Sequence, residues 1–450
     1  DLIFPGNKHS FTPYNIAVRK EIIKYIVNNL ESLGNKEKTL ILFKISEHYS
    51  QTFRNSNCLL KISYSDNNDI KDFDNLFNKI HVNWLTSKIG DKLPYLKFKL
   101  NEKSQGFGVI KFLLNKYSET ILNNTLLCKK NITNKVETLT KLLFCPLNND
   151  DFDNTLYIPY YQDHELTPEI LQNYQNFGIF LAMCLLYYPS SLIISDIIFK
   201  YLSTETITTT SLPIYLQKTL EIIDKCDEEQ FKSMEIYMNI TDTNVYGQSE
   251  IFELEDNGND IQVTINNYEN YKNKIFDFYC WSGGRNRILE RIYIGFHSVM
   301  KHDLIILPEV LAFLINKPSK NNRENSDTWK KYSKILYKDN NENKDKTNFD
   351  NECIETTIKY FFEFIDSIND EEYENLVRFI TGSKVLPLGG LENLSKTDNC
   401  IKIDYVFDSK LPSSSTCINK ITLPMECKDR EEFIKFLRLA INECDNLEFV

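Results

Sequence analysis

The decisive stretch reads Leu411-Pro412-Ser413-Ser414-Ser415-Thr416-Cys417-Ile418-Asn419-Lys420-Ile421-Thr422-Leu423-Pro424. Small residues form a loop in front of Cys417, and the alternation of Ile421 and Leu423 behind it predicts a strand. The flanking prolines limit where that strand begins and ends. A thiol that is exposed to solvent and held by a rigid strand is suited to nucleophilic attack, so Cys417 is the predicted catalytic residue.

The residues around this loop predict a compact α/β unit over residues 354–450. Apolar residues at helical spacing predict two helices, Ile354–Ile365 and Asp370–Thr381. Alternation from Ile401 to Phe407 predicts a strand. Asp429, with Glu432 three residues later, predicts a capping box that opens a final helix. A unit of about one hundred residues is large enough to fold as a domain.

A polar string precedes this unit. No apolar residue occurs between Tyr337 and Phe349, where Lys, Asp, Asn, Glu and Thr make up the chain. Such a segment cannot bury itself, so residues 338–353 are predicted to form a hinge linker. A surface loop inside one domain fits this composition equally well, and the autonomous unit that follows favours the hinge.

The longer first part of the chain is predicted to be largely helical. Residues 1–95 form a helical N-terminal part, and residues 96–337 form a helical body. The body begins with strand-like alternation at Leu96, Phe98 and Leu100, and it ends with a predicted helix pair over 275–300 and 308–314. Residues 212–280 mix helical and strand-like spacing, which predicts a small inserted α+β subdomain.

Composition favours a soluble globular protein. The 450 residues are 42% hydrophobic and 26% charged, and the net charge of -11 argues against a nucleic-acid partner. Residues 177–194 carry no charge and reach the length of a membrane span, but Pro189 interrupts them. A buried helix followed by a second apolar element explains this run better, so we expect no membrane insertion.

The eleven cysteines are scattered and include no C-x-x-C pair, which predicts neither a zinc site nor a disulfide framework. We therefore expect no metal or cofactor and a reducing compartment, the cytoplasm or the nucleus. The chain begins at Asp1, in a Leu-Ile-Phe-Pro stretch typical of the middle of a domain, so we expect a fragment of a longer protein.

Several motifs share one family order. Near the C-terminus the pattern Leu-Pro, short loop, Thr-Cys-x-Asn, strand, Leu-Pro and helix is present, and the stretches at residues 379–383 (F-I-T-G-S) and 386–391 (L-P-L-G-G-L) precede it. These motifs resemble the C-lobe of HECT-type ubiquitin-protein ligases, and their spacing is most similar to the ubiquitin-fusion-degradation branch. Further matches follow the order of the HECT N-lobe: Val263-Thr264, Asn267, Tyr271, Gly295-Phe296, Pro308-Glu309 and Trp329. The glycine turn at 106–108 and, more weakly, Ile3-Phe4-Pro5 extend the resemblance.

The resemblance implies a bilobal α+β fold in which a hinge joins a mostly helical N-lobe, with the small subdomain at 212–280, to a small α/β C-lobe. It implies that Cys417 accepts ubiquitin as a thioester from a conjugating enzyme, docked on that subdomain, and passes it to a lysine of a protein substrate. The expected supporting loop residues are Leu411, Pro412, Thr416 and Asn419. Leu447 and Phe449 stand for the apolar C-terminal tail, although many family members have Phe where this chain has Leu447.

Elementary chemistry limits the mechanism. All six histidines precede residue 338, so the C-terminal unit has no local Cys-His pair, which disfavours a thiol hydrolase. Transfer between thioesters needs no such base. The second step needs an uncharged lysine amine, which a carboxylate helps to deprotonate, and the candidates are Asp408, Glu426, Glu443 and Glu448. A scaffold that binds ubiquitin or the conjugating enzyme without turnover is the other open alternative.

Overall fold

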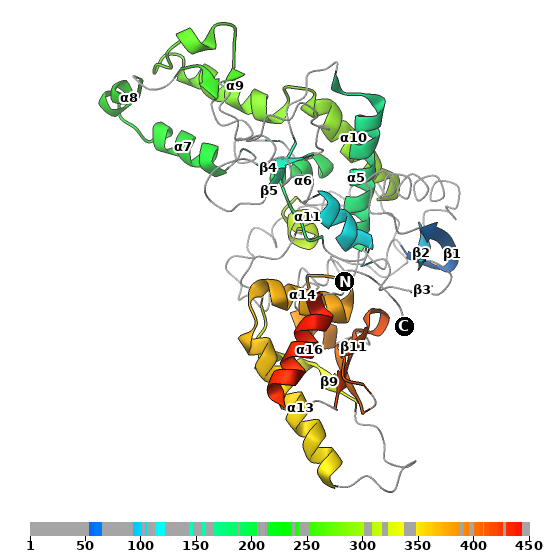
Figure 1. Cartoon of the computed structure of the whole chain (residues 1–450). Coiled ribbons are helices and arrows are strands. Elements are labelled where there is room, and N and C mark those ends of the chain that lie inside the picture. Colours follow the sequence, from blue (N-terminus) through cyan, green and yellow to red (C-terminus); the bar gives the residue numbers. More distant parts are fainter. Residues whose placement is uncertain are drawn as a thin grey trace, which may run out of the picture.

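The structure is a computed structural model. It describes residues 54–64, 93–100, 104–105, 111, 113–121, 144–146, 155–158, 165–186, 190–204, 207, 212, 214–235, 239–242, 252–300, 308–316, 323–336, 348–386, 390–395, 400–407, 409–425 and 429–442. Helices dominate, and short strands form small sheets, so the expected α+β class is confirmed. The described hydrophobic side chains gather into two cores. The helices and strands that carry them form an upper and a lower body in Figure 1.

The first core is built from the buried residues between Leu113 and Ile315, together with Val385. Its helices are α5 (Pro168–Leu186), α6 (Asp196–Leu202), α7 (Ile214–Asp224), α8 (Glu228–Glu235), α9 (Tyr268–Cys280), α10 (Arg285–Val299) and α11 (Pro308–Ile315). One helix was expected over 275–300, but the chain turns between α9 and α10 because Gly283 and Gly284 adopt positive φ.

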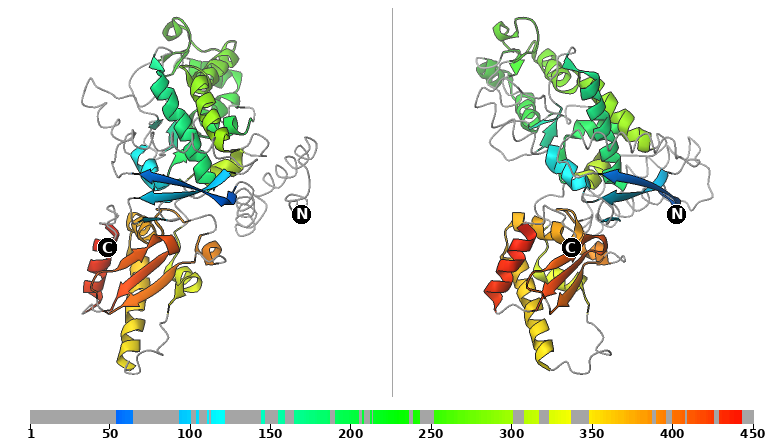
Figure 2. Two further views of the ribbon diagram at one scale, coloured as in Figure 1. Left: turned by 90° about the vertical axis from the view of Figure 1, so that its right-hand side faces the viewer. Right: turned by 45° about the vertical axis from the view of Figure 1, so that its right-hand side comes forward.

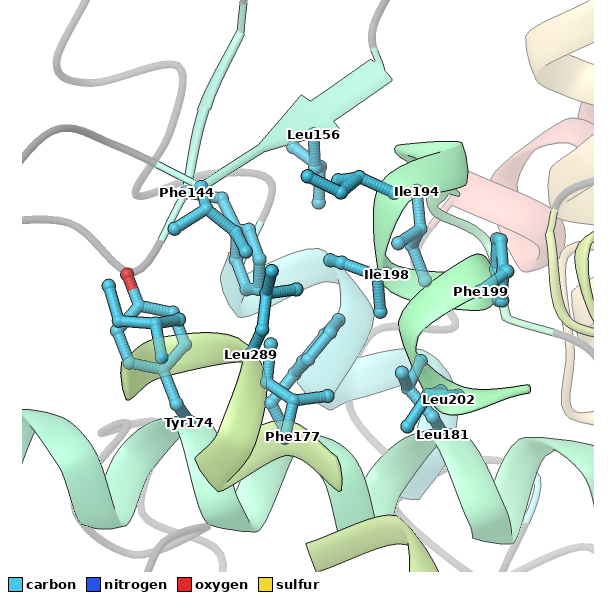
Figure 3. Packing of buried hydrophobic residues seen from close by; sticks show 14 of the residues in the cluster. Phe144, Leu156, Tyr174, Phe177, Leu181, Ile194, Ile198, Phe199, Leu202 and Leu289 are labelled. Atoms are coloured by element: carbon cyan, nitrogen blue, oxygen red, sulfur yellow. The ribbon is translucent and has the colours of Figure 1, made fainter. Parts of the chain in front are cut away.

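Helices α5 and α10 approach each other closely through two glycines. A Cβ added at Gly178 would collide with the carbonyl oxygen of Ile292, and one at Gly295 would collide with that of Gln175. The aromatic and aliphatic side chains between α5, α6 and α10 fill the remaining space, as the packing of Phe177, Ile198 and Leu289 illustrates (Figure 3). This helix pair is the rigid centre of the first core.

The uncharged run at 177–194 lies inside this core. It forms the second half of α5 and leads into β6 (Ile193–Ile194), which pairs with β5 (Thr155–Tyr157), itself paired with β4 (Cys145–Pro146). Phe177, Phe180 and Leu181 are completely buried. Within the described ranges, the helices are all too short or too polar to cross a membrane.

Residues 212–280 contain both helices and strands. Besides helices α7, α8 and α9, this segment contains the antiparallel strands β7 (Thr241–Asp242) and β8 (Phe252–Glu253) and the short 3-10 helix η5 (Gly258–Asp260). The hydroxyl of Tyr268 on α9 donates to the carboxylate of Asp224 at 3.1 Å, which joins α9 to the end of α7. Figure 1 shows that α7 and α8 project to the end of the molecule remote from the second core.

A three-stranded sheet lies outside these helices. Strands β1 (Arg54–Tyr64) and β2 (Leu93–Leu100) pair in parallel, and β3 (Ser104–Gln105) pairs antiparallel with β2. The expected strand at Leu96–Leu100 is confirmed by β2. The expectation that residues 1–95 are helical is wrong for β1, because residues 60–64 alternate apolar and polar side chains with the period of a strand. The helical spacing expected before residue 50 lies outside the described residues.

The second core is built from the buried residues between Trp329 and Ile441. Its sheet has the order β11-β12-β10-β9, and the views in Figure 2 show this sheet beside the long helix α13. The elements are α12 (Ser326–Tyr332), β9 (Lys334–Ile335), α13 (Asn348–Ser367), α14 (Asp370–Thr381), α15 (Gly390–Ser395), β10 (Lys402–Val406), β11 (Ser413–Ser415), β12 (Lys420–Pro424) and α16 (Arg430–Asn442). These elements confirm the helices and strands expected after residue 354, and the side chain of Asp429 caps the N–H of Glu432 at 2.9 Å.

The expected hinge at 338–353 is in the wrong place. Trp329 lies at the centre of the second core and donates from Nε1 to the hydroxyl of Tyr373 at 3.2 Å, and β9 pairs with β10. Elements on both sides of the polar string therefore belong to the same core, and α13 already includes residues 348–353. The chain instead passes from the first core to the second between α11, which ends at Ile315, and α12. Polarity shows only that a segment stays in water, and it says nothing about which core its neighbours join.

Candidate active site

Cys417 lies in the connection of a β-hairpin. The short 3-10 helix η7 (Thr416–Ile418) joins β11 to β12, which pair antiparallel with Ser415 opposite Lys420. β12 confirms the predicted strand, and its Ile421 and Leu423 are completely buried in the second core. The residues in front of Cys417 were expected to form a loop, but Ser413–Ser415 add an edge strand to the sheet. The backbone of Cys417 is therefore fixed on both sides by strands.

Asn419 ends η7 in the left-handed conformation, with φ of 49°. Asparagine tolerates this conformation better than most residues with a Cβ. Its carbonyl oxygen accepts from the N–H of Lys402 at 2.9 Å, and its side-chain oxygen accepts from Nζ of Lys111 at 3.2 Å. Asn419 is only 2% exposed. This residue joins the hairpin both to β10 and to Lys111, which lies just before the helical segment at 113–121.

The other expected loop residues line the approach to the hairpin. Pro412 is buried, Thr416 is half-buried, and Leu411 is 48% exposed. The hydroxyl of Ser409 donates to the carbonyl of Leu411 and accepts from its N–H, which fixes the start of this segment. Ile418 is 44% exposed. Two apolar side chains, at 411 and 418, thus face solvent on either side of Cys417 in the sequence.

Other cysteines have environments that suppress reactivity. Burial raises the pKa of the Cys280 thiol to about 12 and raises that of Cys184 well above its ordinary value. Both thiols therefore stay protonated at neutral pH, and thiols are weaker nucleophiles than thiolates. Cys353 donates from Sγ to the carbonyl oxygen of Met425 at 3.6 Å. Cys427 and Cys444 lie outside the described residues.

Several expected site residues cannot be placed. The tail residues Leu447 and Phe449 and the four candidate acids, Asp408, Glu426, Glu443 and Glu448, lie outside the described residues. Among the histidines, His297 is described, and its Nε2 lies 3.0 Å from the carbonyl oxygen of Leu202 in the first core. No cluster of three or more metal-ligating side chains occurs in the ranges that the structure describes.

The structure adds four charged residues that sequence patterns do not reveal. Lys111, at the start of the helical segment 113–121, contacts the hairpin, and Glu119 on the same segment pairs with Arg378 and Lys384 of the second core. The only available signal is the spacing of Lys111 and Glu119, which places them on one face of a helix. Their partners are more than 250 positions away, so no local pattern predicts the contact.

Comparison with known proteins defines the class. The HECT-domain (ubiquitin-transferase) family matches residues 125–450, so the chain belongs to the HECT-domain family. The predicted family is therefore confirmed. Residues 1–124 lie outside this match, and with them the expected extensions to Ile3-Phe4-Pro5 and to the glycine turn at 106–108.

Particular relatives are E3 ubiquitin-protein ligases. The chain is similar to the ligase TOM1 of Saccharomyces cerevisiae (28% identity over 243 residues, 50% of this chain and 7% of that protein). It is also similar to the probable ligase TOM1 of Eremothecium gossypii (30% over 210 residues, 45% of this chain and 6% of that protein). The ligase TRIP12 of Danio rerio is 27% identical over 180 residues, 38% of this chain and 8% of that protein. TOM1 and TRIP12 belong to the ubiquitin-fusion-degradation branch, which is the branch that the sequence resemblance predicted. The chain spans less than a tenth of the length of these three relatives.

Proposed function

We propose that this chain is the catalytic part of a ubiquitin-protein ligase, in which Cys417 carries ubiquitin as a thioester between a conjugating enzyme and a substrate lysine. The observation that supports this most strongly is the position of Cys417 in a hairpin of the second core, within a chain of the HECT-domain family. In this proposal the first core is the N-lobe and the second core is the C-lobe.

The chemistry divides into two steps. First, the thiolate of Cys417 attacks the carbonyl carbon of the ubiquitin thioester, and the conjugating enzyme leaves as its own thiolate. One thioester replaces another, so this step is nearly balanced and depends on alignment of the reacting atoms. Second, an uncharged lysine amine attacks the new thioester, the thiolate of Cys417 leaves, and the amine loses a proton to form the amide.

The conjugating enzyme is proposed to dock on the subdomain at 212–280. Two exposed apolar side chains favour this choice of docking surface: Ile222 on α7 is 60% exposed, and Ile265, just before α9 in the sequence, is 50% exposed. Large apolar side chains that remain exposed at the tip of a domain suit a protein partner. Because this tip is remote from the second core (Figure 1), the C-lobe has to swing about the junction between α11 and α12 to collect ubiquitin.

A thioester assay tests the proposal. The chain is incubated with a ubiquitin-charged conjugating enzyme, and the products are separated with and without reductant. We expect a reductant-sensitive ubiquitin adduct that disappears in Cys417→Ala and persists in the matched control Cys353→Ala. Absence of this adduct across a panel of conjugating enzymes would refute the relay.

The same assay separates the alternatives. A scaffold binds the charged conjugating enzyme without forming an adduct, whereas a thiol hydrolase releases free ubiquitin without modifying any lysine. The hydrolase is disfavoured, because His297 lies in the first core and the sequence after residue 302 contains no histidine. The relay requires both the adduct and its transfer to an added lysine acceptor.

A further inference from the structure

The two cores touch through a helical segment that the family match does not include. Leu114, Tyr117 and Ile121 of segment 113–121 are buried in the first core. Lys111 and Glu119 are separated by two intervals of four residues, so they share another face of the helix. That polar face meets the second core, as its hydrogen bonds and ion pairs show.

Glu119 is the centre of an ion cluster between the cores. Its Oε1 lies 2.9 Å from Nζ of Lys384 and 3.4 Å from Nη1 of Arg378, and it also accepts from the side-chain amide of Asn115 at 3.2 Å. The side chains of Glu119, Arg378 and Lys384 are 18%, 6% and 27% exposed. Because water is largely excluded, these charges interact more strongly than an exposed surface pair.

Two further contacts extend the interface. Val385 follows directly after Lys384 and is buried in the first core, although its chain neighbours belong to the second. Nζ of Lys111 donates to the side chain of Asn419, two positions after Cys417. The interface therefore includes the catalytic hairpin itself.

We propose that Lys111 and Glu119 are positioning residues, which hold the hairpin of Cys417 against segment 113–121 in a resting position that must open before Cys417 is loaded. This inference rests on the proposed function. Both views in Figure 2 keep the α7–α8 tip at the opposite end of the molecule from the second core. A C-lobe held by the ion cluster is remote from the donor, so each contact that fixes it there opposes loading.

The first measurement is the single-turnover rate of loading from a charged conjugating enzyme. Glu119→Gln keeps the size of the side chain and removes its charge, and Lys384→Gln removes the partner charge. We expect each variant to load about tenfold faster, since a charged hydrogen bond that holds the resting position is lost. The double variant gains little more, because both substitutions remove the same pair.

Glu363→Gln is the matched control. Glu363 pairs with Arg430 at 2.9 Å, and both residues belong to the second core. Removal of this pair changes no contact between the cores, so its loading rate stays at the wild-type value. Thermal unfolding of every variant checks that the fold is intact.

The second measurement does not depend on catalysis. Fluorophores are placed through unnatural amino acids at two exposed positions, Glu229 on α8 and Leu439 on α16, and their distance distribution is recorded by energy transfer. We expect one dominant distance in the wild type and a broader distribution in Glu119→Gln and Lys384→Gln.

The two measurements fail in different ways. Variants that load more slowly, or at the wild-type rate, overturn the resting position, as does an unchanged distance distribution. If the wild-type chain forms no adduct at all, the proposed function fails, while the distance distribution still decides whether the ion cluster holds the cores together.

Discussion

Nζ of Lys111 donates a hydrogen bond to Oδ1 of Asn419 at 3.2 Å, across 308 positions of sequence. Lys111 opens a helical segment anchored in the first core, and Asn419 closes the turn that contains Cys417. The bond connects the hairpin of Cys417 to the opposite core. Any movement of the second core away from the first would have to break this bond, so the energetics of the hairpin and of such a movement are linked.

Substitution of Asn419 separates the two roles of this residue. Asn419→Ala installs a residue that tolerates the left-handed conformation less well than asparagine and removes the acceptor for Lys111, and we expect a loss of about 1–2 kcal/mol in the free energy of unfolding. Asn419→Gly accepts the backbone conformation and removes only the hydrogen bond. Chemical denaturation should therefore find the glycine variant more stable than the alanine variant. Equal losses would show that backbone conformation at 419 is unimportant.

Truncation tests where the second unit begins. A fragment of residues 323–450 contains Trp329 and β9, whereas a fragment of residues 354–450 lacks both and leaves the hydroxyl of Tyr373 without its Trp329 donor. Loss of a buried tryptophan typically costs about 3–5 kcal/mol. We expect cooperative thermal unfolding of the longer fragment and its absence in the shorter one. If the two fragments were equally stable, the second unit would begin after the polar string, as the sequence alone had predicted.

Trp329→Phe refines this test within the full chain. The phenyl ring keeps most of the apolar volume but donates nothing to Tyr373, so we expect a loss of about 1–3 kcal/mol. Chemical denaturation, monitored with a spectroscopic probe in the second core, measures this loss of stability. If the first core unfolds at lower denaturant concentration instead, α12 belongs there.

Close packing of α5 on α10 predicts the effect of a single methyl group. Gly295→Ala forces the helices apart, because the new Cβ collides with the carbonyl oxygen of Gln175. Overpacking of this kind costs about 1–3 kcal/mol. The control Asn286→Ala lies on the same helix at an exposed position and should change the free energy of unfolding by less than about 0.5 kcal/mol. A neutral Gly295→Ala variant would contradict the tight contact.

The environment of Glu324 predicts that the stability of the second core depends on pH. Its carboxylate accepts from the N–H of Leu391 at 3.1 Å, and burial raises its pKa from the usual 4.5 to about 7. The folded chain thus binds this proton more tightly than the unfolded chain. The contribution of Glu324 to the free energy of unfolding is therefore fully present below about pH 4.5. This contribution, on the order of 2 kcal/mol, is lost as the pH rises through about 7.

The Gln variant tests this linkage. Glu324→Gln retains an acceptor for Leu391 and cannot titrate, so its unfolding free energy should vary less between pH 5 and pH 7 than that of the wild type. Glu355→Gln, at an exposed position of α13, is the control and should leave the slope unchanged. A parallel pH profile for wild type and Glu324→Gln would show that another group carries the dependence.

Local patterns in the sequence determined the elements around Cys417. The apolar stripes of α13, α14 and α16 and the alternation of β10 and β12 each repeat within a few residues, so burial on one side is enough to predict the element. The Thr-Cys motif identified the family for the same reason, because its residues are neighbours in the chain.

The tertiary structure alone decided which core each element joins. Trp329 precedes the polar string in the sequence, yet its side chain packs with the residues that follow the string. Glu119 pairs with Arg378 and Lys384 from a segment far away in sequence. Such choices depend on the free energy of contacts between distant parts of the chain, which leave no periodic trace in either partner. The strand and turn around Cys417 were therefore legible in the sequence, and the contacts that hold them against the first core were not.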